Sequence, residues 1–289
     1  MDDDVADYLA SLRVERGLAH NTLSAYRRDL NEYLGFVGTG PPDEPTVAAY
    51  VEYLRSRNLA PASVSRKMAA VRGLHRHLVA EGLASDDPTV LVDRPRLAMS
   101  LPKALAVDEA IALVESPDIS TVAGRRDAAL LEFLYGTGCR VSEAVGLDLA
   151  QLDLVERTSL VTGKGSKQRM VPLGWAAVAA IERWLPDRLD LAKADHDAVF
   201  VNLRGGRLSR QGAFLVVKAA ASRAGVAPER ISPHVLRHSA ATHMIEGGAD
   251  LRSVQEMLGH ANVTTTQVYT RVSPQHLLEV FVQAHPRSR

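Results

Sequence analysis

The sequence has little cysteine, no long apolar run and no net charge. Among its 289 residues the single cysteine is Cys139, so neither an intramolecular disulfide framework nor a multi-cysteine zinc site can form. No apolar run approaches the roughly 20 residues that a membrane-spanning helix needs. The first residues, MDDDVADYLASLRVERG, are acidic and amphipathic, unlike a secretory signal. These absences predict a protein of a reducing cytoplasm.

The formal net charge is zero, from 34 basic and 34 acidic residues, but the charges are unevenly distributed. Between Glu52 and Glu81 there is no acidic residue, and six basic residues give a local charge of +6. From Arg204 to Arg237 seven basic residues accompany one acid, Glu229, which again gives +6. Because the distribution of charge makes a binding surface, the sequence predicts two separate basic regions.

The length of 289 residues is enough for two domains, each with its own core. In the first third, apolar residues at helical spacing predict helices at 4–16, 20–36, 46–57 and 62–82, with Asn21 or Thr22 capping the second. Residues 86–103 carry three prolines and little periodicity, which is typical of a linker. We therefore predict a helical domain over 1–88, a linker over 89–103 and a second domain over 104–289.

The second domain has mixed patterns. The spacing predicts helices at 107–115, 121–137, 141–146, 174–192, 209–225, 233–247, 250–259 and 263–271, and a last one from 274. Residues 157–173 contain two β-prone runs around Gly163-Lys164-Gly165-Ser166, which indicates a hairpin. The predicted fold class is mainly α with a small antiparallel β-sheet.

Three histidines and an arginine lie within the stretch ISPHVLRHSAATHM, residues 231–244. His234 and His238 are four residues apart on one helix face, as in the zinc motif H-E-x-x-H. However, Val235 stands where that motif needs its glutamate. A metal site is therefore the weaker interpretation, and we expect none.

A phosphate site fits the same stretch better. His234 and Arg237 are three residues apart and share a helix face. A guanidinium can donate to two phosphate oxygens, and an imidazole can donate a hydrogen bond or carry a proton. The alternative is that Arg237 pairs with Glu246 or Glu256 and that the histidines are merely solvated.

Other segments carry residues suited to the same chemistry. Arg140 lies in LYGTGCRVSEAVGL, at a glycine-rich turn that enters a helix, and Lys164 lies at the tip of the predicted hairpin. The stretch LGHANVTTTQVYT contains His260 and Tyr269. Together these segments supply a nucleophile, a general acid and cationic groups for an anion.

These motifs resemble the tyrosine site-specific recombinases of the phage integrase family, and within it most closely the Xer recombinases. The family's arginine turn, hairpin lysine, H-x-x-R, histidine and tyrosine correspond to TGCRVSE, TGKGSK, PHVLRH, LGH and VYT. The segments NTLSAYRRDL, LPK and RGGRLSRQG extend the resemblance over nearly the whole chain. NTLSAYRRDL and RLSRQG favour the XerD branch over the XerC branch.

The resemblance implies a fold and an activity. The fold is an N-terminal helical, SAM-like core-binding domain and a C-terminal α+β catalytic domain, which together form a clamp around DNA. The activity is site-specific recombination through a 3′-phosphotyrosyl intermediate and a Holliday junction, with resolution of chromosome dimers at a dif-like site before cell division.

The resemblance also implies partners. These are double-stranded DNA and a homologous, XerC-like recombinase in a cyclic heterotetramer, with a DNA translocase as a candidate activator. The last helix, in SPQHLLEVFVQAH, is expected to pack into a neighbouring protomer. The alternative is that it packs on its own domain.

The residues that match the family's motif imply the roles of nucleophile and base. Tyr269 attacks the scissile phosphorus, and the covalent link preserves the bond for rejoining. A tyrosine with a pKa near 10 is only about 0.1% ionised at pH 7, so it needs cationic neighbours and a proton acceptor. His234 is the expected acceptor. The alternative for Tyr269 is packing of its ring on the core.

The other matching residues imply binding and protonation. Arg140 and Arg237 bind the non-bridging oxygens, whose charge rises in the transition state; a salt bridge from Arg140 to Glu143 is compatible with this role. Lys164 protonates the leaving 5′-oxygen, with Lys167 as its rival. His260 donates a hydrogen bond to the phosphate; its alternative is a cap at a helix end.

The basic regions supply the predicted DNA contacts: Arg66, Lys67, Arg72, Arg76, Arg207 and Arg210. Most such contacts bind the backbone and a few read bases. We expect no cofactor, since arginine and lysine supply the charge and no P-loop is present. Four alternative functions stay open: a phage or mobile-element integrase, a type IB topoisomerase, a non-catalytic DNA-binding regulator and a metal-dependent hydrolase.

Overall fold

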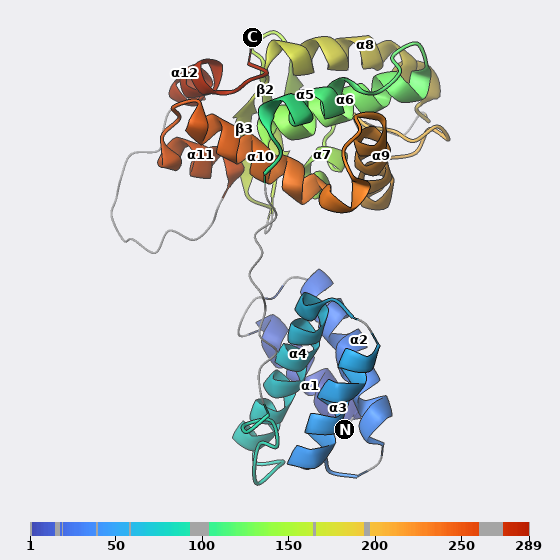
Figure 1. Ribbon diagram of the computed structural model, residues 1–289, viewed down its shortest axis with the longest axis vertical. Helices are drawn as coiled ribbons and strands as arrows, with labels where there is room; N and C mark the ends of the chain where they lie inside the picture. Colours follow the sequence, from blue (N-terminus) through green and yellow to red (C-terminus); the bar gives the residue numbers. More distant parts are fainter. Residues whose placement is uncertain are drawn as a thin grey trace. The chain divides into compact units, whose positions relative to one another are not determined.

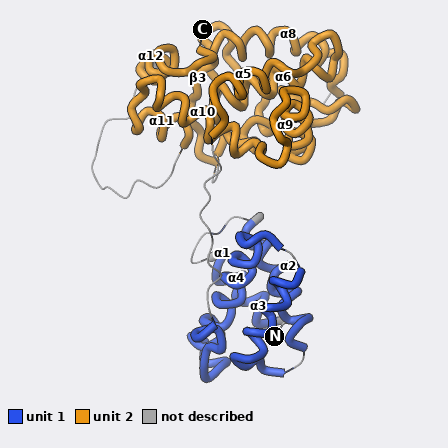
Figure 2. The backbone as a smooth tube through the Cα atoms, in the orientation of Figure 1, with its two compact units in different colours: residues 1–100 blue, residues 101–289 orange. Residues whose placement is uncertain are grey.

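The computed structural model describes residues 2–14, 18, 20–38, 40–57, 59–92, 104–163, 166–193, 197–259 and 274–288. The chain forms two compact units, residues 1–100 and 101–289 (Figure 2). Within those described ranges no helix combines the length and the apolar character that crossing a membrane requires. The domain limits predicted from the sequence, 88/89 and 103/104, stay predictions.

The first unit is helical (Figure 1). Its helices are α1 (Asp2–Val14), α2 (His20–Val37), α3 (Glu44–Ser56) and α4 (Pro61–Ala80). Asp43 caps α3, because its carboxylate accepts the backbone N–H of Thr46 at 2.9 Å. Pro61 occupies the first position of α4, where its missing N–H costs nothing. Helix α2 begins at His20, so the predicted cap at Asn21 or Thr22 is wrong.

The core of the first unit contains buried tyrosines as well as aliphatic residues. Tyr33 is fully buried between Tyr50 and His75, and its hydroxyl lies 2.8 Å from Nε2 of His75. Burial raises the pKa of Tyr33 and lowers that of His75. Both groups are therefore held neutral at physiological pH, as a hydrogen-bonded pair inside the helical bundle.

Part of the first basic region lies inside this unit. Lys67 is buried, and its Nζ lies 3.2 Å from Oδ1 of Asp29 and 2.8 Å from Oε2 of Glu32. Arg66 pairs with the same Asp29. Because α2 supplies the acids that neutralise these α4 cations, the +6 of this sequence stretch overstates the charge of the surface.

The second unit combines helices with a small sheet. It contains α5 (Val107–Glu115), α6 (Val122–Thr137), α7 (Val141–Val145), η1 (Leu149–Gln151), β1 (Leu152–Asp153), β2 (Thr158–Thr162), β3 (Gln168–Pro172), α8 (Trp175–Leu191), α9 (Arg210–Arg223), η3 (Pro228–Arg230), α10 (Pro233–Glu246), α11 (Leu251–Leu258) and α12 (Pro274–Ala284). The sheet is antiparallel with the order β1-β2-β3, which confirms the predicted fold class. The short strand β1 was not predicted.

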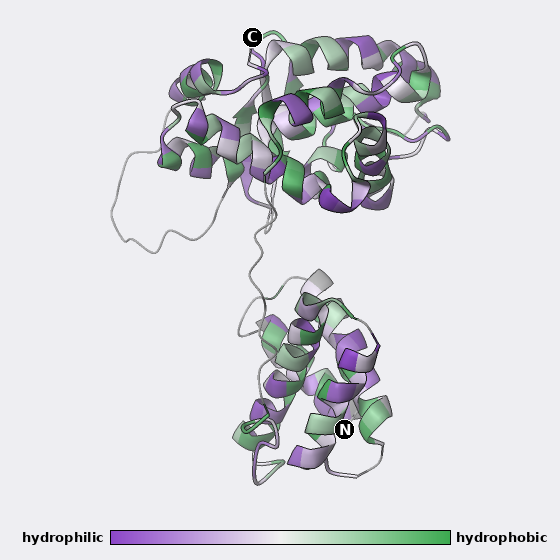
Figure 3. Cartoon of the chain, viewed as in Figure 1, coloured by the Kyte–Doolittle hydropathy of each residue, from purple (hydrophilic) through white to green (hydrophobic). Residues whose placement is uncertain are grey.

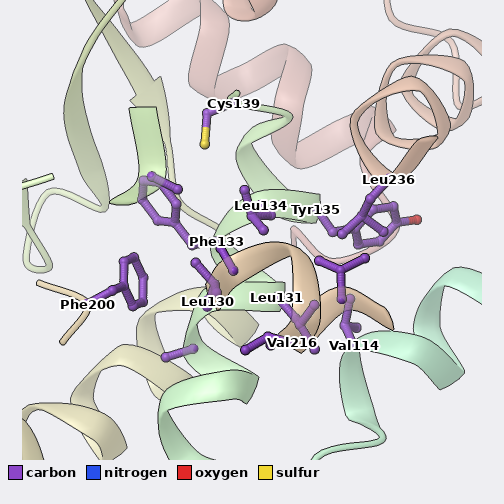
Figure 4. Close-up of a cluster of buried hydrophobic side chains, with 14 of the residues drawn as sticks. Val114, Leu130, Leu131, Phe133, Leu134, Tyr135, Cys139, Phe200, Val216 and Leu236 are labelled. Atoms are coloured by element: carbon purple, nitrogen blue, oxygen red, sulfur yellow. The ribbon is translucent and has the colours of Figure 1, made fainter. Parts of the chain in front are cut away.

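The core of the second unit is built around α6. Leu130, Leu131, Phe133 and Leu134 are buried in it, and they lie among side chains of the neighbouring helices in Figure 4. Figure 3 shows hydrophilic and hydrophobic residues mixed along the helices of both units, as amphipathic helices require. The packed core fixes the C-terminal end of α6, where the candidate site begins.

Helix α12 packs on its own unit in this chain. Phe281 is fully buried and joins a small core with Met244 of α10 and Met257 of α11. The guanidinium of Arg287 pairs with Glu132 and Glu115 near the C-terminus. In the single chain the last helix therefore packs on its own domain, which was the alternative considered from the sequence. Exchange of this helix between protomers stays a prediction.

We predict that Lys67→Met destabilises the first unit by about 3 kcal/mol, because a buried carboxylate loses a partner. Arg55→Met is the matched control: Arg55 and Glu52 are 51% and 68% exposed, and such pairs contribute under about 1 kcal/mol. Both tryptophans, Trp175 and Trp184, lie in the second unit, so their fluorescence would miss the change. Hydrogen exchange of α2 and α4 peptides in the full chain measures it. Equal protection in the two variants would contradict the assignment of Lys67.

Candidate active site

The candidate site begins at the turn that ends α6. Gly138 has a φ of 59°, a left-handed conformation that glycine adopts without strain. A Cβ on Gly138 would lie 2.8 Å from Cδ2 of Leu258, so a larger residue there would have to displace the Leu258 side chain of α11. The turn directs the chain through Cys139 to Arg140, which precedes the first residue of α7.

A single carboxylate holds Arg140. The Oε2 of Glu143 accepts the backbone N–H of Arg140 at 2.8 Å, and its Oε1 accepts Nη1 of the same residue at 3.0 Å. The salt bridge that the three-residue spacing indicates is therefore confirmed. The side chain of Arg140 is still 43% exposed, so the guanidinium can also donate to a ligand.

Arg237 comes to the same turn from α10. Its Nη1 donates to the carbonyl of Gly138 and its Nη2 to the carbonyl of Leu258, each at 2.7 Å. The predicted alternative of a pair with Glu246 or Glu256 is wrong, because backbone oxygens take these donors. Burial, and next the charge of Arg140, lowers the pKa of Arg237 to about 10. The group is therefore still cationic at neutral pH.

A third guanidinium belongs to the site and was missed by sequence reasoning. Arg169 on β3 donates Nη1 and Nη2 to Glu143 at 3.0 and 2.8 Å, and Nε to the carbonyl of Met257 at 2.7 Å. Strand alternation carries a signal for it. Residues two apart on a strand lie on the same face of the sheet. Arg169 therefore shares the inner face with the buried Val171.

Glu143 is almost completely enclosed, with 1% of its side chain exposed. Burial alone would raise the pKa of this carboxyl, but hydrogen bonds from Arg169 and Arg140 hold it below the ordinary value. The carboxylate is ionised at neutral pH. Arg140 and Arg169 thus bind this one carboxylate, and Arg237 lies at the same turn, which leaves an excess of two positive charges among the three guanidiniums.

The end of α11 connects the three arginines. The consecutive carbonyls of Met257, Leu258 and Gly259 accept hydrogen bonds from Arg169, Arg237 and Arg140 at 2.7, 2.7 and 3.5 Å respectively. These are carbonyls of a helix C-terminus, which carries partial negative charge. Cations there are favourable, and the helix end in turn holds the guanidiniums in place.

Of the other predicted catalytic residues, the structure describes one. His234 is exposed in the first turn of α10, which Ser232 caps by accepting the N–H of Val235 at 3.3 Å. Lys164, His260 and Tyr269 lie outside the described residues. The structure thus brings together Arg140 and Arg237 and presents His234 one helical turn from Arg237.

The predicted DNA contacts of the second unit differ in their surroundings. The guanidinium of Arg207 lies 2.5 Å from Oδ1 of Asp148 and donates to the carbonyl of Val145 at 3.1 Å. Arg210 is exposed at the first position of α9, behind the cap Ser209. Arg207 therefore holds local structure, whereas Arg210 faces solvent.

The remaining predicted contacts lie on α4. Arg72 donates to the carbonyl of Val92 at 2.7 Å, and the exposed Arg76 donates Nε to the carbonyl of Arg72 at 3.2 Å. Lys67 is enclosed, as described above, and Arg66 is partly exposed. A DNA contact by any of these stays a prediction.

Metal ligands do not gather in the part of the chain that the structure describes. There, no three residues among histidine, cysteine, aspartate and glutamate are close enough to hold an ion together. Cys139 is buried, and burial raises the pKa of its thiol to about 12, so it is a poor nucleophile at neutral pH. The described groups are suited to an anion.

The fold and site define a two-unit, mainly helical protein with three guanidiniums gathered between the α6–α7 turn and the end of α11. Residues 5–82 match the N-terminal SAM-like domain of phage integrases, and residues 103–276 match the phage integrase family. The chain is 47% identical to the tyrosine recombinase XerD of Mycobacterium tuberculosis, over 98% of this chain and 97% of that protein. It is 41% identical to XerD of Listeria innocua over the full length of both. The chain therefore belongs to the phage integrase family, as a tyrosine recombinase of the XerD type.

Solved structures share the fold. The XerA recombinase aligns with a TM-score of 0.52 and 28% identity, over 97% of each chain. The XerH recombinase in a post-cleavage complex aligns with a TM-score of 0.72 and 24% identity, over 98% of this chain and 84% of that one. Lambda integrase (75–356) aligns with a TM-score of 0.71 and 17% identity, over 94% of this chain and 98% of that one.

We predict that Glu143→Gln destabilises the second unit by about 3 kcal/mol at pH 7, since it breaks a buried ion pair. The folded pKa of Glu143 is depressed. Its contribution is therefore fully present above the unfolded pKa of about 4.3. It is lost as the pH falls through the folded value.

Urea unfolding followed by fluorescence of the buried Trp184 measures this difference at several pH values. Glu156→Gln, at an exposed carboxylate, is the control and should be neutral throughout. A stability difference between wild type and Glu143→Gln that is independent of pH would contradict the depressed pKa.

Proposed function

We propose that this recombinase acts on double-stranded DNA at a dif-like site. It cleaves each strand through a 3′-phosphotyrosyl link to Tyr269, passes through a Holliday junction and rejoins the strands, and so resolves chromosome dimers before division. The relatives that are 47% and 41% identical are named XerD recombinases, which supports this branch over a mobile-element integrase. The proposed place of action is the cytoplasm.

The single observation that carries the chemistry is the excess of positive charge at the α6–α7 turn. Arg140 and Arg169 share one carboxylate, Glu143. The described donor contacts of Arg237 at the same turn go to carbonyl oxygens only. A phosphodiester that gains negative charge in its transition state would be stabilised there. Hydrogen bonds within the protein already hold these guanidiniums, so they would need little reorganisation at the moment of reaction.

The proposed roles follow from charge and exposure. Arg140, which is partly exposed, and Arg237, which is rigidly held, would donate to the two non-bridging oxygens. Tyr269 would attack the phosphorus, and His234, exposed one turn from Arg237, would accept its proton. No divalent cation is needed for these steps, because the guanidiniums supply the charge.

Two further residues complete the proposed site. Lys164 would protonate the leaving 5′-oxygen, and His260 would donate a hydrogen bond to the phosphate. Both directly follow glycines that the structure describes, Gly163 and Gly259, and these glycines lie against Glu143 and Arg169.

Binding of DNA by both units, as a clamp, completes the proposal. The exposed cations Arg76 and Arg210, together with the partly exposed Arg66, are the best backbone contacts, and Arg72 and Arg207 would act by supporting their segments. Lys67 is not among the proposed contacts, because its ammonium is enclosed between two carboxylates.

The proposed assembly is a cyclic heterotetramer with an XerC-like recombinase, for which a DNA translocase is the candidate activator. Helix α12 would then leave its own unit and pack into a neighbour. It would have to give up the buried Phe281, so the neighbouring protomer must offer an equivalent apolar groove.

We predict a covalent adduct with a nicked duplex that carries a dif-like site. The adduct should form in the presence of a chelator, because the guanidiniums replace metal, and Tyr269→Phe should abolish it. Denaturing electrophoresis of end-labelled DNA measures it. Tyr26→Phe, at a partly buried tyrosine of the first unit, is the control and should react normally. An adduct that persists in Tyr269→Phe would contradict the assignment of the nucleophile.

We predict that DNA affinity falls steeply with salt, because cations at the phosphates release counterions. Arg210→Ala should lower the slope of log affinity against log salt by about one. Arg183→Ala is the control, since Arg183 is exposed on α8, and it should keep the slope. Fluorescence anisotropy of a labelled duplex from about 50 to 200 mM salt measures both. Equal slopes for the two variants would exclude Arg210 as a phosphate contact.

A further inference from the structure

We propose that Arg169 is a positioning residue for strand cleavage. It would join three chain segments that carry proposed catalytic groups: the α6–α7 turn with Arg140, the hairpin with Lys164 and the end of α11 before His260. The inference rests on the proposed function and deepens it, because it assigns a task to a side chain outside the recombinase motif described above.

All three nitrogens of the Arg169 guanidinium are used. Nη1 and Nη2 donate to the two oxygens of Glu143, and Nε donates to the carbonyl of Met257 in the last turn of α11. The side chain is 16% exposed. A planar fork that donates in two directions at once is a property of arginine, whereas a lysine offers one compact ammonium. Lysine can therefore keep the charge but not both contacts.

Two glycines show how closely the neighbouring segments approach this ion pair. A Cβ on Gly259 would lie 3.0 Å from Nη1 and 3.1 Å from Cδ of Arg169. A Cβ on Gly163 would lie 3.2 Å from Oε1 of Glu143 and 3.8 Å from Nη1 of Arg169. These glycines directly precede His260 and Lys164 in the sequence. Both segments therefore begin close to the Glu143–Arg169 ion pair.

The third segment is the α6–α7 turn, which carries Arg140. Glu143 accepts both its backbone N–H and its Nη1, so the carboxylate sets the position of the guanidinium. Arg169 in turn holds both oxygens of that carboxylate. Displacing Arg169 would therefore shift Arg140 and the end of α11 together, and a displacement of about 1 Å can cost about 100-fold in rate.

The test compares Arg169→Lys and Arg169→Gln with a matched control. Arg125→Lys alters the Arg125–Asp187 pair, in which Nε and Nη2 donate at 2.5 and 2.8 Å. That pair joins α6 to α8 at the end of α6 opposite Gly138. The control therefore breaks a similar two-bond ion pair in the same unit, away from the proposed site.

Two kinetic quantities are measured on the full chain. Single-turnover adduct formation on the nicked duplex, over a range of protein concentrations, yields the maximal rate and the half-saturating concentration. We expect both Arg169 variants to lose about 10- to 100-fold in maximal rate. Their half-saturating protein concentration should stay within about twofold of the wild-type value. Arg125→Lys should keep the wild-type maximal rate.

Hydrogen exchange of peptides that cover residues 251–262 and 160–168 supplies a readout that does not depend on enzymatic activity. Exchange in both peptides should be faster in Arg169→Lys than in Arg125→Lys. If wild type forms no adduct, the proposed function fails, while the exchange data still decide whether Arg169 holds these segments.

Three results would overturn the inference. The first is a wild-type maximal rate in Arg169→Lys and Arg169→Gln, and the second is a loss confined to half-saturation. The third is unchanged exchange in both peptides. If Arg169→Gln does not fold, Arg169→Lys, which keeps the charge beside Glu143, decides the matter alone.

Discussion

The site depends on one buried carboxylate, Glu143, that binds two guanidiniums. A carboxylate with 1% exposure is unfavourable unless its oxygens are fully hydrogen-bonded and its charge is balanced. Arg140 and Arg169 meet both conditions, and they come from segments 29 residues apart in the sequence. The turn after α6, the strand β3 and the end of α11 are therefore held in one arrangement. Removing either arginine would leave the buried carboxylate with fewer hydrogen bonds and one ion-pair partner instead of two.

The same pair leaves the site with an excess of positive charge. Glu143 neutralises one positive charge of three, so the excess remains on Arg140 and Arg237, whose other described partners are backbone carbonyls. Carbonyl oxygens carry partial charges and satisfy the donors geometrically without cancelling their charge. A phosphate can therefore be attracted strongly by groups that are already fixed. This arrangement is consistent with the recombinase family to which the chain belongs.

Sequence patterns predicted much of this architecture. Helical periodicity located the described α-helices to within a few residues, and the glycine-rich hairpin signal located β2 and β3. The helix predicted at 263–271 lies outside the described residues. The pattern could not reveal β1, because two residues are too few for a period. It also overstated the basic surface at residues 52–81, since the acids that pair with Lys67 lie in α2. Arg169 was overlooked because a lone strand arginine resembles any solvated charge until its partner is known.

The sequence by itself determined the family, the order of the elements and the residues that could perform the chemistry, because these follow from local periodicity and short motifs. Only the tertiary structure decided which charges pair. Lys67 became a buried counterion, Arg237 a donor to the carbonyls of Gly138 and Leu258, and Arg169 the link between three segments. The physical reason is that an ion pair is set by distance in space and by burial, and neither can be read from separation along the chain.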